Sequence, residues 1–203
     1  MSPASEPVPG TAESVVGADP LPRVRRSPAR SERSLVAGAL AGSEADLEAL
    51  FREHWPRAYR AAFLIVHDHA AAEDIAQEGF LAAIRRLDRF DRRRRFSPWL
   101  YTIVANRAID WTRARAARPD NGGQPPESAA APEQAPGPYS EEVLAALRAL
   151  SPEHRAVVVL RYVVECTPGE IARALELPRG TVNSRLRRGL DALEARLREA
   201  ELR

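Results

Sequence analysis

The most informative local pattern lies in the last third of the chain: Thr167-Pro-Gly-Glu-Ile-Ala-Arg-Ala-Leu-Glu-Leu-Pro-Arg-Gly-Thr-Val-Asn-Ser-Arg-Leu-Arg-Arg188. Thr167, the proline after it and Glu170 three residues on predict the N-cap, first position and capping box of a helix. Residues 177–180, Leu-Pro-Arg-Gly, predict a turn, and Thr181 is expected to cap a longer helix. A short helix, a Gly-containing turn and a longer helix together predict a helix-turn-helix.

The second helix of this motif is expected to expose basic and amide side chains. Val182, Leu186 and Leu190 recur at helical spacing and are expected to face the first helix. Arginine pairs with guanine and asparagine with adenine, and the N-terminal end of such a helix enters the major groove. Free N–H groups beside Thr181 would attract a phosphate. An amphipathic bundle helix with a solvated arginine face is the alternative. The residues expected to contact duplex DNA are Arg179, Thr181, Asn183, Ser184, Arg185, Arg187 and Arg188.

The rest of the chain also shows helical periodicity and no strand-like alternation, so the predicted fold is all-α. Ser43, Ser97 and Ser151 each precede an apolar-periodic run and are expected to be N-caps, the last two with proline at the first helical position. Pro56 is expected to interrupt or kink its helix. The predicted helices cover about 34–41, 44–63, 70–90, 98–117, 141–150, 152–164, 168–175 and 182–197.

Composition divides these helices into two small domains. Residues 119–139 contain six prolines and three glycines, which is typical of a flexible linker. Residues 1–33 are rich in Pro, Ser, Ala and Arg without apolar periodicity, and we expect a disordered tail. The predicted order is therefore a tail (1–33), a first helical domain (34–118), a linker that also carries acidic residues (119–139), and a second domain with the helix-turn-helix (140–203).

Charge is distributed unevenly along the chain. The net charge is only +2, but residues 85–118 contain eleven arginines and three acidic residues, and residues 179–188 contain four arginines and no acid. Two basic patches predict two contacts with a polyanion. The single cysteine excludes an internal disulfide. No apolar run is long enough to cross a membrane, and the first thirty residues lack the apolar stretch of a signal peptide, so a cytoplasmic protein without membrane insertion is expected.

Two sets of motifs resemble the extracytoplasmic-function (ECF) sigma factors of RNA polymerase. Leu150-Ser-Pro-Glu-His-Arg155, Leu160-Arg, Glu170-Ile-Ala and Gly180-Thr-Val-Asn-Ser-Arg185 resemble region 4 of that family. Ala72-Glu-Asp-Ile-Ala-Gln-Glu-Gly-Phe80, Phe96-Ser-Pro-Trp-Leu100, Ile103-Val-Ala-Asn106, Asp110 and Arg113 resemble region 2. The resemblance covers about residues 44–117 and 140–198. It implies a protein without an active site or cofactor that binds core RNA polymerase, recognises the −35 and −10 promoter elements and helps to melt the duplex.

The resemblance also implies roles for the first domain. An acidic face is expected to dock on the clamp helices of core polymerase; the alternative is that this face only increases solubility. The flap of the polymerase is also expected to contact the chain. These acidic-face residues are Glu73, Asp74, Gln77 and Glu78. The −10 strand, with a flipped base, is expected to meet Arg92, Arg93, Arg94, Arg95, Phe96, Ser97, Asn106, Asp110 and Arg113. Phe96 is either a wall of the base pocket or a core residue, and Trp99 is expected in the core. An anti-sigma factor is the expected regulator.

Two other readings of the sequence lead to different classes of protein. His67, His69 and Glu73 are close in sequence and could belong to a metal enzyme. However, two histidines separated by one residue point to different faces of a helix, so no metal site is expected. The histidines are instead expected to end or cap a helix. An ordinary helix-turn-helix regulator would explain residues 180–188 but not the paired motifs of the first domain. Cys166 is either a thiol sensor or a small buried hydrophobic residue.

Overall fold

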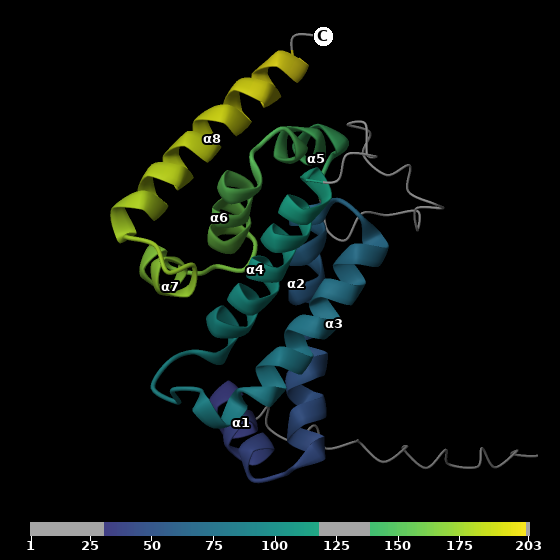
Figure 1. Cartoon of the computed structure of the whole chain (residues 1–203), viewed down its shortest axis with the longest axis vertical. Helices are drawn as coiled ribbons and strands as arrows, with labels where there is room; N and C mark the ends of the chain where they lie inside the picture. The colour runs from purple at the N-terminus through teal and green to yellow at the C-terminus, as the bar shows by residue number, and fades with distance from the viewer. Residues whose placement is uncertain (1–30, 118–138, 202–203) are drawn as a thin grey trace, which may run out of the picture. The chain divides into compact units, whose positions relative to one another are not determined.

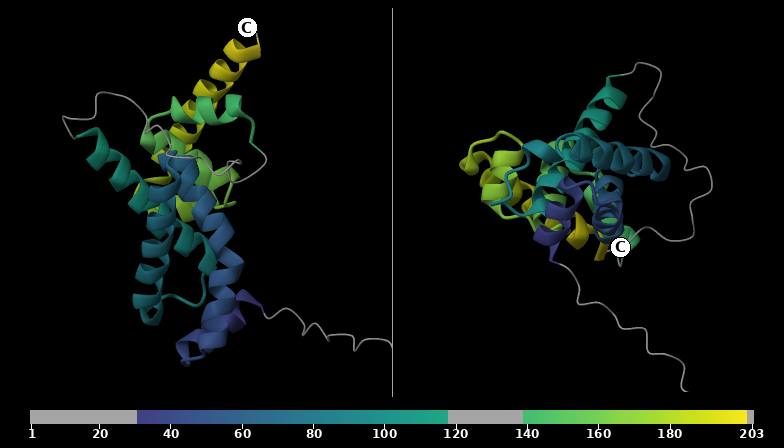
Figure 2. Two further views of the ribbon diagram at one scale, coloured as in Figure 1. Left: turned by 90° about the vertical axis from the view of Figure 1, so that its right-hand side faces the viewer. Right: turned by 90° about the horizontal axis from the view of Figure 1, so that it is seen from below.

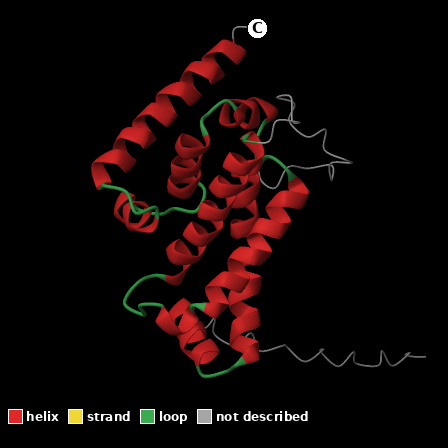
Figure 3. Cartoon of the chain, viewed as in Figure 1, coloured by secondary structure: helices red, strands yellow, loops and turns green. Residues whose placement is uncertain are grey.

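The computed structural model describes residues 31–117 and 139–201, and within these ranges helices are joined by short loops and no strand is present (Figure 3). The predicted all-α class is therefore confirmed. The helices are α1 (Glu32–Leu40), α2 (Glu44–Val66), α3 (His69–Arg85), the short 3-10 helix η1 (Leu87–Arg89), α4 (Phe96–Ala116), α5 (Glu141–Arg148), α6 (Pro152–Tyr162), α7 (Pro168–Ala174) and α8 (Arg179–Glu201) (Figure 1). The predicted tail and linker fall almost entirely outside the described residues, and the domain boundaries at 118 and 140 stay a prediction.

Several predicted caps are present as local hydrogen bonds. The Ser43 hydroxyl accepts from the Asp46 amide, and the Ser151 hydroxyl accepts from the His154 amide. At the start of α7 both bonds of a capping box are present. α2 runs through Pro56 as one helix of 23 residues. A proline within a long helix is tolerated here, so the expectation that Pro56 interrupts this stretch was wrong.

Two predicted helix starts were wrong. α4 begins at Phe96 with Arg95 at the N-cap position, so Ser97 lies inside the first turn and does not cap the helix. α8 begins at Arg179, and the amides of Thr181 and Val182 both donate to the Pro178 carbonyl. The turn of the helix-turn-helix therefore lies before Arg179, at residues 175–178. Its left-handed residue is Glu176, with φ of 52°, rather than a glycine.

The core forms where the apolar faces of these helices meet. α2, α3 and α4 run side by side and pack on one another, and the views of Figure 2 show α1 at the end of the molecule where α2 begins. α3 and α4 approach closely because Gly79 has no side chain: a Cβ there would lie 2.5 Å from Val104 Cγ2. α6 packs against α7 and α8 and also contacts α2 and α4. Among the described helices, none combines the length and apolarity that a membrane span requires.

Candidate nucleic-acid interface

The first turns of α8 separate an apolar anchor from a polar outer face. Val182 and Leu186 are buried, as their spacing predicted, and Leu190 is half-buried. Asn183 and Arg187 point outward and are exposed. The anchor fixes the rotation of the helix about its axis, so the outer face is presented in one orientation. Of the other residues predicted to meet duplex DNA, Arg179 and Arg188 are exposed, and Thr181, Ser184 and Arg185 are half-buried.

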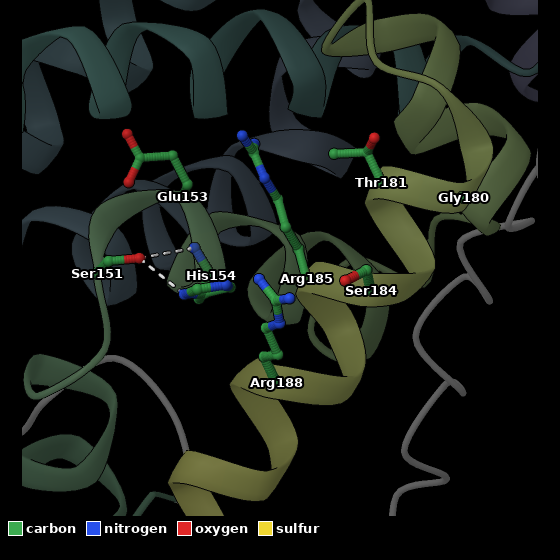
Figure 4. Close-up of a pocket in the computed structure, with 8 residues that line it drawn as sticks. All are labelled: Ser151, Glu153, His154, Gly180, Thr181, Ser184, Arg185 and Arg188. Carbon is green, nitrogen blue, oxygen red and sulfur yellow. Dashed lines mark hydrogen bonds between the residues drawn. The ribbon is translucent and has the colours of Figure 1, made fainter.

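A cleft of about 520 Å³ lies between this end of α8 and the start of α6. Arg185 and Arg188 project from α8 into the cleft, and Ser151 and His154 line its opposite wall (Figure 4). The Ser151 hydroxyl and His154 Nδ1 are 2.9 Å apart. The sequence identified Ser151 only as a helix cap and gave His154 no role, because nothing in their spacing shows that α6 and α8 share a cleft.

The cleft also holds one carboxylate, that of Glu153. It accepts hydrogen bonds from Nε and Nη2 of Arg113 on α4, at 3.1 and 2.8 Å. These bonds lower the pKa of Glu153, and the charge of Arg185 lowers it further, although partial burial acts in the opposite direction. Glu153 is therefore ionised near neutral pH and offsets part of the positive charge of the cleft.

The second basic surface is the loop that precedes α4. Arg92, Arg93, Arg94 and Arg95 are all exposed. Phe96 behind them is only 5% exposed and packs against Phe90 and Trp99, with ring centroids 5.7 and 5.6 Å away. In this conformation Phe96 is a core residue and offers no free ring face to a base, and Trp99 is half-buried beside it. The sequence left Phe96 open between pocket wall and core, and it predicted Trp99 in the core, against which Trp99 packs as a partly buried residue.

The structure divides the residues predicted to meet the −10 strand into two groups. Asn106 Nδ2 donates to the Ala174 carbonyl on α7 at 3.3 Å, and Arg113 is held by Glu153. At 1.5 Å per residue, Asn106 lies ~16 Å along the helix from Arg95. The arginine loop and the Asn106–Arg113 face therefore do not form one pocket. Asp110 is exposed and lines a different cleft, beside α3.

The acidic face on α3 points to solvent, as its spacing predicted. Glu73, Asp74, Gln77 and Glu78 are all exposed. Glu78 forms an ion pair of 2.8 Å with Arg107 on α4, which the sequence did not indicate. Together the four side chains form an exposed polar strip along the helix.

The histidines and the cysteine have structural roles in this fold. His67 ends α2 in the left-handed conformation, with φ of 54°, and His69 Nδ1 lies 2.7 Å from the Tyr59 hydroxyl. Within the described ranges, no three His, Cys, Asp or Glu side chains gather as metal ligands would. Cys166 is buried, and burial together with Glu170 raises the pKa of its thiol to about 12. A buried protonated thiol fits the small hydrophobic residue better than the thiol sensor.

Comparison with known proteins identifies the family to which the chain belongs. Sigma-70 region 2 matches residues 50–118, and Sigma-70, region 4 matches residues 140–193. The ECF RNA polymerase sigma factor SigW of Bacillus subtilis is 31% identical over 175 residues, which is 76% of this chain and 89% of SigW. RNA polymerase sigma factor CarQ of Myxococcus xanthus is 35% identical over 167 residues, 79% of this chain and 94% of CarQ.

The chain belongs to the ECF sigma factors of the sigma-70 family. It is a promoter-recognising sigma factor that directs transcription initiation, as the motif resemblance predicted. Solved structures show the same fold. CnrH, solved in complex with the cytosolic domain of CnrY, has a TM-score of 0.61 at 26% identity, and the match covers 83% of this chain and 97% of CnrH. RpoE, solved with the anti-sigma factor NepR from Bartonella quintana, shares the fold with a TM-score of 0.64 at 24% identity, over 75% of this chain and 97% of RpoE.

Proposed function

We propose that this sigma factor recognises its promoter through two separate surfaces, the outer face of α8 for the −35 duplex and the region around α4 for the −10 strand. The observation that carries the proposal is the arrangement of α8. Val182 and Leu186 anchor the helix, while Asn183 and Arg187 face outward and Arg185 borders the cationic cleft. This is the arrangement with which a recognition helix enters a major groove. Residues Arg179, Thr181, Ser184 and Arg188 complete the proposed −35 surface.

Two kinds of contact are proposed for the −10 strand. The exposed arginines 92–95 attract the phosphates of the melted strand, with Ser97 beside them. Asn106, Asp110 and Arg113 supply polar groups to an unstacked base. Asn106 and Arg113 are engaged by Ala174 and Glu153 in this conformation, so they must exchange these partners for DNA. The polymerase is expected to hold α4 away from α6 and α7, so that the two DNA-binding surfaces match the spacing of the two promoter elements.

The exposed strip of Glu73, Asp74, Gln77 and Glu78 is the proposed contact with the clamp helices of core polymerase, and the second domain is the proposed contact with the flap. Glu78 would exchange Arg107 for a polymerase residue. RpoE was solved in complex with the anti-sigma factor NepR; we infer that an anti-sigma factor also binds this chain. In this role the chain is not an enzyme, and it acts in the cytoplasm with the polymerase.

The decisive experiment is run-off transcription with core polymerase and the purified chain on a library of promoter fragments, followed by sequencing of the 5′ ends. Transcripts that begin at defined promoters are expected only when both proteins are present. Absence of promoter-specific transcripts would reject the proposal. Tight, sequence-specific binding of the chain to promoter duplex without polymerase would favour an ordinary helix-turn-helix regulator.

Substitution of Arg185 tests the −35 surface. Arg185→Ala should weaken −35 recognition by holoenzyme by ~1–3 kcal/mol if the guanidinium reads a base. Arg196→Ala, at the exposed far end of the same helix, is the matched control. Promoter preference that is the same in both variants and in the unmodified chain would remove Arg185 from the site.

Asn106→Ala should impair promoter opening, measured by permanganate reactivity, and leave −35 binding intact.

A further inference from the structure

The start of α4 is closed by a residue from a distant helix. Arg95 occupies the N-cap position but makes no side-chain hydrogen bond to the helix. The first turn of an α-helix has amide groups without acceptors inside the helix. In α4 these donors belong to Phe96 and Ser97, because the third residue, Pro98, has no N–H.

Glu32, the first residue of α1, provides both missing acceptors. Its Oε2 accepts from the Phe96 amide at 3.2 Å, and its Oε1 accepts from the Ser97 amide at 3.0 Å. A carboxylate at this position also interacts favourably with the positive end of the helix dipole. One side chain therefore performs the task that a local Ser, Thr or Asp performs in other helices, from 64 residues away in the sequence.

A buried histidine lies next to Glu32. His54 Nε2 lies 3.4 Å from Glu32 Oε1, and His54 Nδ1 lies 3.0 Å from the Tyr101 hydroxyl on α4. Burial lowers the pKa of His54, although the charge of Glu32 opposes that shift. A neutral His54 leaves the negative charge of Glu32 available to the two amides. Leu35 and Val36 are buried and hold α1 in place, so the position of Glu32 is fixed by packing.

The cap that Glu32 forms on α4 lies directly beside the arginine loop, residues 92–95. Glu32 and Phe96 line a small cleft together with Arg92, Arg94 and Arg95. The loop leads into α4 without an intervening residue, so the direction in which α4 starts determines where its arginines stand. Loss of the two bonds would let the first turn fray and would release the loop.

We propose that Glu32 is a positioning residue for capture of the −10 strand, which it serves by fixing the first turn of α4 and the arginine loop before it. The inference rests on the proposed −10 role of this loop. Glu32 does not itself contact DNA. Its negative charge would repel a phosphate, so a purely electrostatic effect of removing it would strengthen binding, whereas loss of positioning weakens binding.

The test uses holoenzyme reconstituted with core polymerase and a fork-junction DNA that carries the −10 element of a promoter mapped by run-off sequencing. Glu32→Ala should bind this DNA about fivefold more weakly, which is the scale of a lost helix cap. Binding of −35 duplex should be unchanged. Glu48→Ala is the control, because Glu48 is an exposed carboxylate on α2 whose ion-pair partner is Arg52. It should stay within about twofold of the unmodified chain.

A double-mutant cycle separates positioning from general damage. Arg95→Ser places a local acceptor at the N-cap of α4 and removes one arginine from the rim. In that background, Glu32→Ala should cost less than in the unmodified chain, because Ser at this position can accept from the Ser97 amide. An equal cost in both backgrounds would overturn the inference.

Hydrogen exchange of the full chain, measured without DNA, tells the two proposals apart. Glu32→Ala should speed exchange of the Phe96 and Ser97 amides and leave the amides of α8 unaffected. Faster exchange with normal binding of the fork-junction DNA would overturn the positioning role. If unmodified holoenzyme does not prefer the −10 fork over a scrambled fork, the proposed −10 function is rejected. The exchange result would still test whether Glu32 caps the first turn of α4.

Discussion

The starts of α7 and α4 resemble each other in sequence and differ in structure. Both show a hydroxyl residue followed by proline, Thr167-Pro168 and Ser97-Pro98. At α7 the Thr167 hydroxyl accepts from the Glu170 amide at 3.2 Å, and the Glu170 carboxylate accepts from the Thr167 amide at 2.7 Å. At α4 the helix starts one residue before Ser97, and the Glu32 carboxylate accepts hydrogen bonds from the Phe96 and Ser97 amides.

The difference shows how a remote residue can override a local signal. A local cap needs only residues within one turn of the chain, so its stability does not depend on the rest of the fold. A cap from another helix forms only after both helices have packed. Once Glu32 is in place, the first turn of α4 can extend to Phe96, and Ser97 no longer has a capping role.

The end of α2 combines both kinds of closure. His67 ends the helix locally in the left-handed conformation. Arg155 on α6 closes it remotely by donating to the Ile65 carbonyl. The same guanidinium donates to three carbonyls at and beyond the end of α5, at 2.8–2.9 Å, namely those of Leu147, Arg148 and Leu150. One buried arginine therefore holds the ends of two helices.

The largest effect is expected at this remote closure. Arg155→Met should lower the free energy of unfolding by about 3 kcal/mol, because several buried carbonyls lose a charged donor at once. Urea unfolding followed by circular dichroism measures the change. Arg148→Met, an exposed arginine at the end of α5, should change the same quantity by less than about 0.5 kcal/mol. Equal losses in the two variants would contradict the role of Arg155.

The local closure at His67 should appear as a pH dependence of stability. Burial, with a further contribution from the charge of Arg155, lowers the pKa of His67 to about 3. The unfolded chain then binds a proton that the folded chain does not, so stability should fall as pH decreases from about 6.5 towards 3. The contribution amounts to about 2 kcal/mol at pH 5.

His67→Asn should remove this contribution, since asparagine tolerates the left-handed conformation and does not titrate. The measurement is the difference in unfolding free energy between about pH 7.5 and pH 5 for the variant and the unmodified chain. Parallel pH profiles would show that His67 is not the group responsible.

The smallest effect is expected at the helix starts that the sequence marks most clearly. Thr167→Ala should cost about 1 kcal/mol of stability, because it removes a local cap. Thr181→Ala is the matched control: Thr181 was predicted to cap α8 but lies inside its first turn, so the loss should be below about 0.5 kcal/mol. Thermal unfolding of both variants decides the point, and a larger loss at Thr181 would restore it as the cap.

The sequence by itself was sufficient to predict most of the helices, their apolar faces and several caps that act within one turn, although Ser97 and Thr181 were wrongly predicted as caps. Val182 and Leu186 were correctly placed inside, and Ser43, Ser151 and Thr167 were correctly identified as caps. These features depend on residues three or four apart, whose relation in a helix is fixed by its geometry. The paired motifs also identified the family.

Only the tertiary structure decided which distant groups meet. It buried Phe96 and placed Ser151 and His154 across a cleft from the arginines of α8. It also engaged Asn106 and Arg113 with α7 and α6, and assigned Arg155 and Glu32 to the ends of other helices. Such contacts depend on how whole helices pack, and no spacing along the chain encodes the packing of one helix end against a side chain 64 or 90 residues away.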